Sequence, residues 1–313
     1  MDKIALIGAG LIGSGWGIVF AEAGRNPVLY DADPAATENA LVEIEKGLAD
    51  LDSYGLIDEA PAQILARVGT AATLEEAVDG AAHVQESIPE RVELKRALFE
   101  QLDAMVPHEI TIASSTSTIP TSLFTEHLAG RARCIVAHPG TPPHLLRLVE
   151  IVPSPWTNPA VVASTRQLME DCRQIPSVLK KEIQGFILNR IQYAVISEAY
   201  RLWDDDVAGI EDIEKTVRDA LGLRWSFMGA METISLNAPG SVPDYNERYG
   251  QWVHEINATQ TARPWDGAAV ERLEAERLRS RPAMDNTSRR VWRDRRLMAL
   301  LAHKRERAKI EGE

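Results

Sequence analysis

The apolar positions of the chain begin as short runs separated by amphipathic stretches. An apolar run at 3–8 stops at a glycine, a stretch of small and apolar residues follows at 11–24, and a second apolar run covers 27–31. Short uninterrupted apolar runs are typical of buried strands, and longer periodic stretches are typical of helices. The first 31 residues are therefore predicted to form a strand–helix–strand unit.

The same alternation continues to residue 180. The stretch 35–66 predicts two amphipathic helices with a break near 53–55. Further strands are expected at 83–87, 110–114, 134–138, 148–152 and 177–180. Strands that alternate with helices form a mostly parallel, doubly wound sheet that helices cover on both faces.

Strand signals almost stop after residue 184, and helical periodicity replaces them. Helices are expected at 186–204, 210–221, 228–236 and 285–309. We therefore expect an α/β domain over 1–184 and an all-helical domain over 185–313.

A glycine motif, Gly8-Ala9-Gly10-Leu11-Ile12-Gly13, stands between the first predicted strand and helix. In that context the three glycines give a tight turn, a close approach of pyrophosphate and close helix–strand packing, as in Rossmann-like domains. Asp31 ends the second predicted strand, where a carboxylate binds ribose hydroxyls and repels a 2′-phosphate. The motif predicts binding of NAD rather than NADP.

Composition narrows the class of partner. With 34 Lys and Arg against 46 Asp and Glu, the formal charge of the 313 residues is -12, which disfavours nucleic acid and anionic membranes. The two cysteines and the absence of an export signal or a long apolar stretch predict a cytoplasmic protein. The seven histidines show no metal-binding spacing and no G-x-S-x-G is present, so metal enzymes and serine hydrolases are disfavoured.

His138 is the candidate general base, because it ends an apolar strand at the ligand-binding edge of the predicted sheet. Glu150 lies inside the apolar run LVEIV, where a carboxylate needs a partner. If the connection 140–147 folds back, the two side chains meet and the carboxylate orients the imidazole. A core histidine and a solvent-facing glutamate are an equal alternative.

Two further polar residues are candidates for substrate contact. Ser117 follows the strand at 110–114, and Asn189 opens the first helix of the second domain. A hydroxyl and an amide there would hold the substrate oxygen against His138. The alternatives are a helix N-cap serine and a helix-surface asparagine.

Together with two further motifs, these residues resemble the 3-hydroxyacyl-CoA dehydrogenase superfamily. The two additional motifs are Glu90 with Lys95 five residues later, and H-P-x-x-P-P…L-V-E from 138 to 150. The motifs S-S-T-S at 114–117, which contains Ser117, and G-F-I-L-N-R at 185–190, which contains Asn189, match the family as well. Within the superfamily, nearly the whole chain is similar to the lambda-crystallin / L-gulonate 3-dehydrogenase branch.

The resemblance implies a helical second domain that forms a homodimer, with the active site in the cleft between the domains. It implies that His138 and Glu150 are the catalytic pair and that Ser117 and Asn189 contact substrate. It also implies that Asp31, Glu90 and Lys95 contact the NAD cofactor.

Two positions depart from the family. Thr141 replaces an asparagine that usually contacts cofactor or substrate, and a threonine lacks the paired donor and acceptor of an amide. Arg147 replaces a proline of the nearest branch. Either change could alter the choice of substrate.

The charge of the segment 35–67 bears on the substrate. It holds seven acidic residues but only Lys46 and Arg67, which disfavours the phosphates of coenzyme A and favours a free acid. Arg147 or Arg224 would receive the carboxylate, unless each is merely exposed or paired with a neighbouring acid. The sequence predicts an NAD-dependent dehydrogenase of a small L-3-hydroxy acid such as L-gulonate.

Three alternatives stay open. L-carnitine would need an aromatic box, for which Trp203, Trp225, Tyr245, Tyr249 and Trp252 are available. A 3-hydroxyacyl-CoA thioester is the second alternative. A non-catalytic NAD-binding protein, structural or regulatory, is the alternative from another class.

Overall fold

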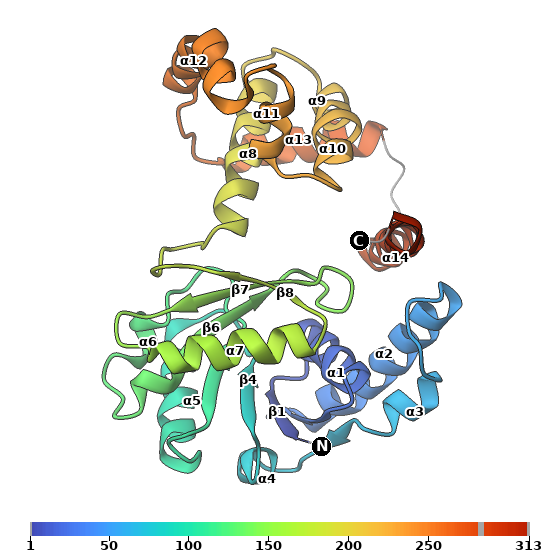
Figure 1. Cartoon of the computed structure of the whole chain (residues 1–313), viewed down its shortest axis with the longest axis vertical. Coiled ribbons are helices and arrows are strands. Elements are labelled where there is room, and N and C mark those ends of the chain that lie inside the picture. The colour runs from blue at the N-terminus through green and yellow to red at the C-terminus, as the bar shows by residue number, and fades with distance from the viewer. Residues whose placement is uncertain (1, 281–284, 312–313) are drawn as a thin grey trace. The chain divides into compact units, whose positions relative to one another are not determined.

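The computed structural model describes residues 2–280 and 285–311. By their contacts, the described residues of 2–189 and 286–311 form one compact unit, and those of 190–285 form another. The first unit holds an eight-stranded sheet in the order β3-β2-β1-β4-β5-β6-β7-β8 (Figure 1). Its strands are β1 (Lys3–Ile7), β2 (Asn26–Tyr30), β3 (Gly69–Thr70), β4 (His83–Glu86), β5 (Thr111–Ser114), β6 (Cys134–Pro139), β7 (Leu148–Pro153) and β8 (Ile175–Val178).

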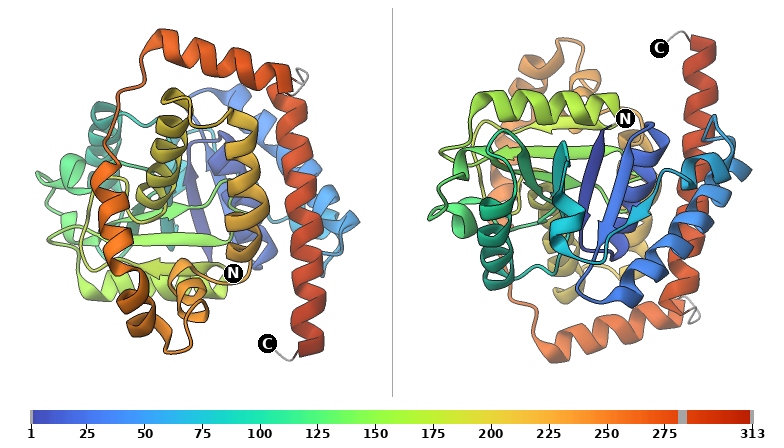
Figure 2. Two further views of the ribbon diagram at one scale, coloured as in Figure 1. Left: turned by 90° about the horizontal axis from the view of Figure 1, so that it is seen from above. Right: turned by 90° about the horizontal axis from the view of Figure 1, so that it is seen from below.

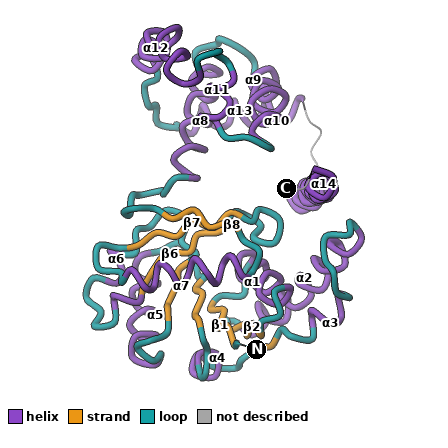
Figure 3. Tube along the Cα trace, in the orientation of Figure 1, coloured by secondary structure: helices purple, strands orange, loops and turns teal. Residues whose placement is uncertain are grey.

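Neighbouring strands are parallel except for β6 and β7. The helices of the sheet unit are α1 (Leu11–Glu22), α2 (Pro34–Ser53), α3 (Pro61–Leu65), α4 (Leu74–Val78), α5 (Val92–Met105), α6 (Ser122–Thr125), the 3-10 turn η1 (Arg131–Arg133), α7 (Pro159–Asp171) and α14 (Asn286–Glu311). Figure 3 shows how these helices alternate with the strands along the chain. The predicted fold class, a doubly wound and mostly parallel sheet with a helical region after it, is confirmed.

Alternate residues of the strands face two separate cores. Ile4 and Leu6 of β1 belong to a cluster with residues of α1, α2 and α7. Ala5 and Ile7 belong to a second cluster with residues of α4, α5 and α6. Because successive side chains of a strand point to opposite faces, a short apolar strand is buried on both sides by these two layers.

The last helix differs from the expectation, which placed it in a helical domain over 185–313. Met298 of α14 is 3% exposed and belongs to the core cluster of α1 and α2. Arg305 donates to the carbonyl oxygen of Gly55 at 2.9 Å and also pairs with Asp58. These contacts group α14 with the sheet unit, and Figure 2 shows the helix from two further sides.

The described residues of 190–285 are helical. They comprise most of α8 (Leu188–Asp204), then α9 (Ile210–Thr216), the π-helical segment η2 (Val217–Gly222), α10 (Leu223–Trp225), α11 (Ala230–Leu236), α12 (Ser241–Thr259) and α13 (Gly267–Ser280). Tyr200, Trp203, Ile213 and Ala269 form their core. The sequence did not predict α12 and α13, because most residues of both helices are exposed and their apolar periodicity is weak. None of the described helices has both the length and the apolar character of a membrane span.

Candidate active site

The glycine turn has the conformation that its motif predicts. Gly8 has φ +102°, and its N–H donates to the carbonyl oxygen of Tyr30 at 2.8 Å. A Cβ on Gly13 would lie 1.9 Å from the carbonyl oxygen of Gly8, so the start of α1 packs directly on the turn. A Cβ on Gly10 would meet no atom within 4 Å, and no side chain caps the start of α1. The turn therefore leaves open space beside helix N–H groups, as a pyrophosphate requires.

Asp31 lies directly beside this turn. Its Oδ2 accepts a hydrogen bond from the N–H of Ala9 at 2.8 Å, and its Oδ1 accepts one from the N–H of Asp33 at 3.0 Å. The carboxylate is therefore held at the end of β2, where it can bind ribose hydroxyls. Turn, helix start and carboxylate together fit NAD.

The antiparallel pairing of β6 and β7 brings together the candidate base and its carboxylate. His138 and Glu150 are opposite one another in the register, and His138 Nδ1 lies 2.8 Å from Glu150 Oε2. Their exposed fractions are 5% and 1%, so water does not separate them. With Nδ1 facing the carboxylate, Nε2 is the ring nitrogen left for a substrate.

The second oxygen of Glu150 is held by the start of α8. Oε1 accepts hydrogen bonds from the N–H groups of Ile187 at 2.7 Å and Leu188 at 2.9 Å. Burial acts to raise the pKa of Glu150, but the hydrogen bonds from His138 and from these two amides outweigh it and lower the pKa. The carboxylate is thus ionised at neutral pH.

Ser117 is fixed through its backbone on both sides. Its N–H donates to Glu90 Oε1 at 2.9 Å, and its carbonyl oxygen accepts a hydrogen bond from Asn189 Nδ2 at 2.7 Å. The side chain of Ser117 is exposed, whereas Asn189 is buried. An amide has two N–H groups and a carbonyl oxygen, so Asn189 can bind Ser117 and a substrate together.

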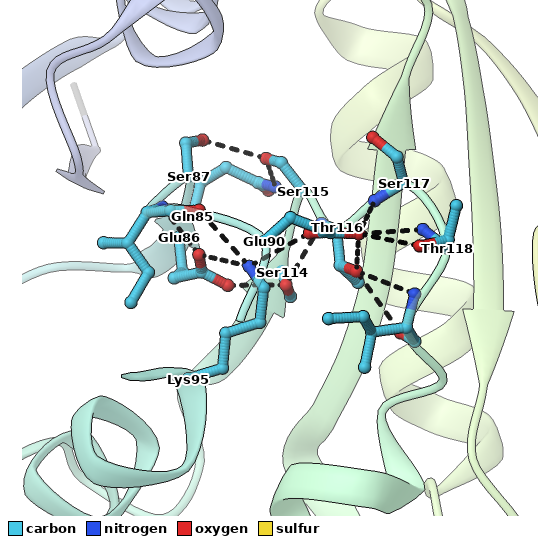
Figure 4. A network of polar contacts seen from close by, with 12 residues as sticks. Gln85, Glu86, Ser87, Glu90, Lys95, Ser114, Ser115, Thr116, Ser117 and Thr118 are labelled. Carbon is cyan, nitrogen blue, oxygen red and sulfur yellow. Dashed lines mark hydrogen bonds and ion pairs between the residues drawn. The ribbon is translucent and has the colours of Figure 1, made fainter. Parts of the chain in front are cut away.

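The remaining two predicted cofactor residues belong to a polar network (Figure 4). Glu90 Oε1 accepts hydrogen bonds from three consecutive residues, Thr116, Ser117 and Thr118. The ammonium of Lys95 is 1% exposed and lies 2.7 Å from Glu86 Oε1. Lys95 therefore pairs with a buried carboxylate, that of Glu86, which the sequence analysis did not single out.

No local signal singled out Glu86. Its strand reads His83-Val84-Gln85-Glu86, with Val84 as the one apolar residue, whereas Glu150 lies inside the apolar run LVEIV. Burial of an acid in a strand requires a partner, and Lys95 supplies it.

Of the three further residues predicted to bind substrate, Thr141 and Arg147 belong to the sheet unit and Arg224 to the helical unit. Thr141 is exposed on the connection between β6 and β7. Arg147 is half-buried directly before β7, and its carbonyl oxygen accepts a hydrogen bond from the N–H of Ile175 at 2.7 Å. Arg224 is exposed on α10 of the helical unit.

Comparison with known proteins agrees with this geometry. Residues 3–183 match the model of the 3-hydroxyacyl-CoA dehydrogenase NAD-binding domain, and residues 185–273 match that of the C-terminal domain of the same family. Lambda-crystallin of Oryctolagus cuniculus is 38% identical over 309 residues, which cover 97% of this chain and 96% of the relative. L-carnitine dehydrogenase of Oceanobacillus iheyensis is 36% identical over 236 residues, 75% of this chain and 76% of the relative.

A solved structure covers the whole chain. It is 5-formyl-3-hydroxy-2-methylpyridine 4-carboxylic acid 5-dehydrogenase, described as an NAD+-dependent dismutase, with a TM-score of 0.83 and 26% identity over 100% of this chain and 99% of that one. The NAD-binding motif, the histidine–glutamate pair and both family models lead to one conclusion. The chain belongs to the 3-hydroxyacyl-CoA dehydrogenase family of NAD-dependent oxidoreductases.

Proposed function

We propose that this dehydrogenase oxidises the 3-hydroxyl of a small, free L-3-hydroxy acid, of which L-gulonate is the first candidate. The observation that carries the chemistry is the buried contact of 2.8 Å between His138 Nδ1 and Glu150 Oε2. A dehydrogenase of this type needs a group that removes a hydroxyl proton near neutral pH, and an imidazole oriented by a carboxylate does so.

Each residue of the site has one role in the proposed reaction. His138 Nε2 removes the proton of the 3-hydroxyl, and Glu150 stabilises the imidazolium that forms. The hydroxyl of Ser117 and the amide of Asn189 bind the same substrate oxygen and orient it. The glycine turn and Asp31 would hold NAD, which would supply the hydride acceptor for the oxidation.

The preference for a free acid rests on the α2–α3 segment. Its two cations are engaged by acids: Lys46 lies 2.9 Å from Glu43, and Arg67 is paired with Glu59. The segment therefore offers acidic residues and already paired cations to a ligand, which disfavours the phosphates of coenzyme A. The pyridine carboxylic acid named for the solved relative is also a free acid.

L-carnitine is the second candidate, because an L-carnitine dehydrogenase is 36% identical to this chain. A quaternary ammonium requires exposed aromatic faces. Of the predicted aromatic residues, Trp203 is covered by Arg272 at 5.2 Å, whereas the rings of Tyr245 and Tyr249 lie 4.9 Å apart on α12. Trp225 and Trp252 are also exposed, at 37% and 64%, so these tryptophans and the tyrosine pair are the aromatic residues available for such a box.

We also infer a homodimer formed through the helical unit. Large apolar side chains are exposed there, among them Phe227 at 69% and Met231 at 72%. Apolar surface of this kind marks an interaction site. Light scattering of the wild type and of a Met231→Glu variant tests this inference. We expect a dimer for the wild type and a weaker dimer for the variant. A monomeric wild type would contradict the inference.

The proposed substrate is tested by NADH formation with L-gulonate, 3-hydroxybutyrate, L-carnitine and 3-hydroxybutyryl-CoA. We expect the highest kcat/KM with a free hydroxy acid, and none of these activities in His138→Ala. If only 3-hydroxybutyryl-CoA were turned over, the substrate class would be acyl-CoA thioesters and not free hydroxy acids. NAD binding without turnover of any of the four would favour the non-catalytic alternative.

A further inference from the structure

A network of charged side chains joins the ends of strands β4 and β5 to helix α5 next to Ser117. Glu86 at the end of β4 is fully buried, as is Lys95 of α5, and Glu86 Oε1 lies 2.7 Å from the ammonium. The same oxygen accepts the N–H of Ile88 at 2.7 Å, and Oε2 accepts the hydroxyl of Ser114 at 2.5 Å. Glu86 therefore holds the end of β5 directly.

Lys95 connects this carboxylate to a second one. Its ammonium lies 3.7 Å from Glu90 Oε2, while Glu90 Oε1 faces the opposite way, toward the loop after β5. The ammonium thus stands between two carboxylates, closer to Glu86 than to Glu90. Because the ammonium binds Glu86 more closely than Glu90, Glu90 can bind the loop with its other oxygen.

Every contact that Glu90 Oε1 makes with the loop is one in which the loop donates. Thr116 Oγ1 donates at 2.7 Å, and the N–H groups of Ser117 and Thr118 each donate at 2.9 Å. Burial acts to raise the pKa of Glu90, but the Thr116 hydroxyl, the Thr118 amide, Lys95 and the Ser117 amide outweigh it and lower the pKa. The hydroxyl of Thr118 is a fourth donor to this oxygen, at 3.3 Å, and an ionised carboxylate is a pure acceptor, as four donors require.

The two carboxylates act on adjoining parts of one segment. Ser114 Oγ, which is bound to Glu86, also accepts the N–H of Thr116 at 3.2 Å. Glu90 binds the following residues, as Figure 4 shows. The backbone of Ser117 is thereby fixed by groups that make no contact with its hydroxyl.

We propose that Glu86 is a positioning residue that acts through Lys95 and Glu90 on the backbone of Ser117. Without the charge of Glu86, the buried ammonium has Glu90 as its remaining carboxylate and draws it away from the loop. The N–H of Ser117 then loses its acceptor, and the hydroxyl loses its fixed direction. The effect on turnover rests on the proposed role of Ser117, whereas the effect on the loop does not.

Hydrogen exchange of the full-length chain tests the loop directly, by mass spectrometry of peptides that cover 114–119. Glu86→Gln should speed exchange at Ser117 and Thr118 about tenfold or more. Glu90→Ala should speed the same exchange. This variant takes the place of Glu86→Gln if Glu86→Gln does not fold, because the Glu90 side chain is 38% exposed and Glu86 is fully buried. Asp103→Asn breaks another buried ion pair, with Arg133 at 2.8 Å, and should leave this exchange unchanged.

A double-mutant cycle with Ser117→Ala tests the link to turnover. Glu86→Gln should lower kcat roughly 10- to 100-fold in the wild type and should cost little more in Ser117→Ala. Asp103→Asn should be additive with Ser117→Ala. Unchanged loop exchange in a folded Glu86→Gln, unchanged exchange in Glu90→Ala, or full additivity with Ser117→Ala overturns the proposal. Loss of loop protection with no effect of Ser117→Ala on kcat would instead overturn the role that the proposed function gives to Ser117.

Discussion

His138 and Glu150 are direct partners across the antiparallel strands β6 and β7, with Nδ1 and Oε2 2.8 Å apart. The turn between the strands sets this register, since Gly140 N–H donates to the carbonyl oxygen of Leu148 at 2.8 Å. A slip of one residue would turn one side chain to the other face of the sheet. The strand pairing thus makes the contact that the proposed proton transfer needs.

Replacement of His138 by Ala should abolish turnover and leave NAD binding intact. The imidazole touches Glu150 and Phe186, whereas the expected cofactor contacts lie at the glycine turn and Asp31. We expect kcat to fall by about three orders of magnitude or more and the Kd for NAD to change less than about twofold. Steady-state kinetics and NAD titration measure the two. A variant with near-normal kcat would refute the assignment of the base.

Glu150→Gln should show how the ionised carboxylate contributes to stability. Hydrogen bonds lower the pKa of Glu150 below its unfolded value, so its contribution is present above about pH 4.3 and is lost as the pH falls through the folded pKa. The variant should be less stable than the wild type at neutral pH, and the difference should shrink in acid. Denaturant titrations at pH 7 and in acid measure the difference. A gap that is constant or that widens in acid contradicts the prediction.

Asp31→Ala should narrow the preference for NAD over NADP. The carboxylate is held by the N–H groups of Ala9 and Asp33 at the end of β2, where it repels a 2′-phosphate. We expect kcat/KM for NAD to fall and the ratio of NAD to NADP to drop at least about tenfold. Asp33→Ala is the matched control, because Asp33 caps α2 through its contact with Ala35. An unchanged cofactor ratio in Asp31→Ala would remove this role from the carboxylate.

Much of this arrangement was predictable because its signals are local. The glycine motif, the run that ends in Asp31 and the apolar strands each occupy a few consecutive residues, and all are placed by the structure near their predicted positions. The meeting of His138 and Glu150 was one of two open alternatives, since it depended on whether the connection 140–147 folds back. The antiparallel pairing of β6 and β7 decided it.

Other parts depend on contacts that no local pattern reveals. Glu86 is buried because Lys95 and Ser114, which lie nine and 28 positions away, complete its hydrogen bonds. The helix α14 joins the sheet unit because Met298 enters its core, although the charged surface of this helix gave no such sign. Long-range burial of this kind decides packing after the local elements have formed.

The glycine turn offers a pair of variants that separates folding from cofactor binding. Gly10 has φ -75°, and a Cβ there meets no atom within 4 Å, so Gly10→Ala should fold with nearly unchanged stability. Its methyl group would occupy the space that pyrophosphate needs, and NAD affinity should fall about tenfold or more. Gly13→Ala would place Cβ 1.9 Å from the Gly8 carbonyl oxygen and should lose several kcal/mol of stability. Thermal unfolding and NAD titration measure both, and equal effects of the two variants on stability would contradict this account.

The buried His83 should make the chain less stable in mild acid. It is 3% exposed, its Nε2 lies 3.2 Å from Gln85 Oε1, and burial lowers its pKa to about 4. Between pH 6.5 and pH 4 the unfolded chain therefore binds a proton at this position that the folded chain does not, and stability rises with pH.

His83→Gln removes this titration while a polar side chain stays opposite Gln85. The wild type should lose about 2 kcal/mol of unfolding free energy from this group between pH 7 and pH 5, and the variant should lose correspondingly less. Denaturant titrations at the two pH values give the loss for each protein, and any constant cost of the substitution cancels because it is subtracted within that protein. If the variant kept the full loss of the wild type, His83 would be charged in the folded protein at pH 5, and the low pKa that its burial implies would be wrong.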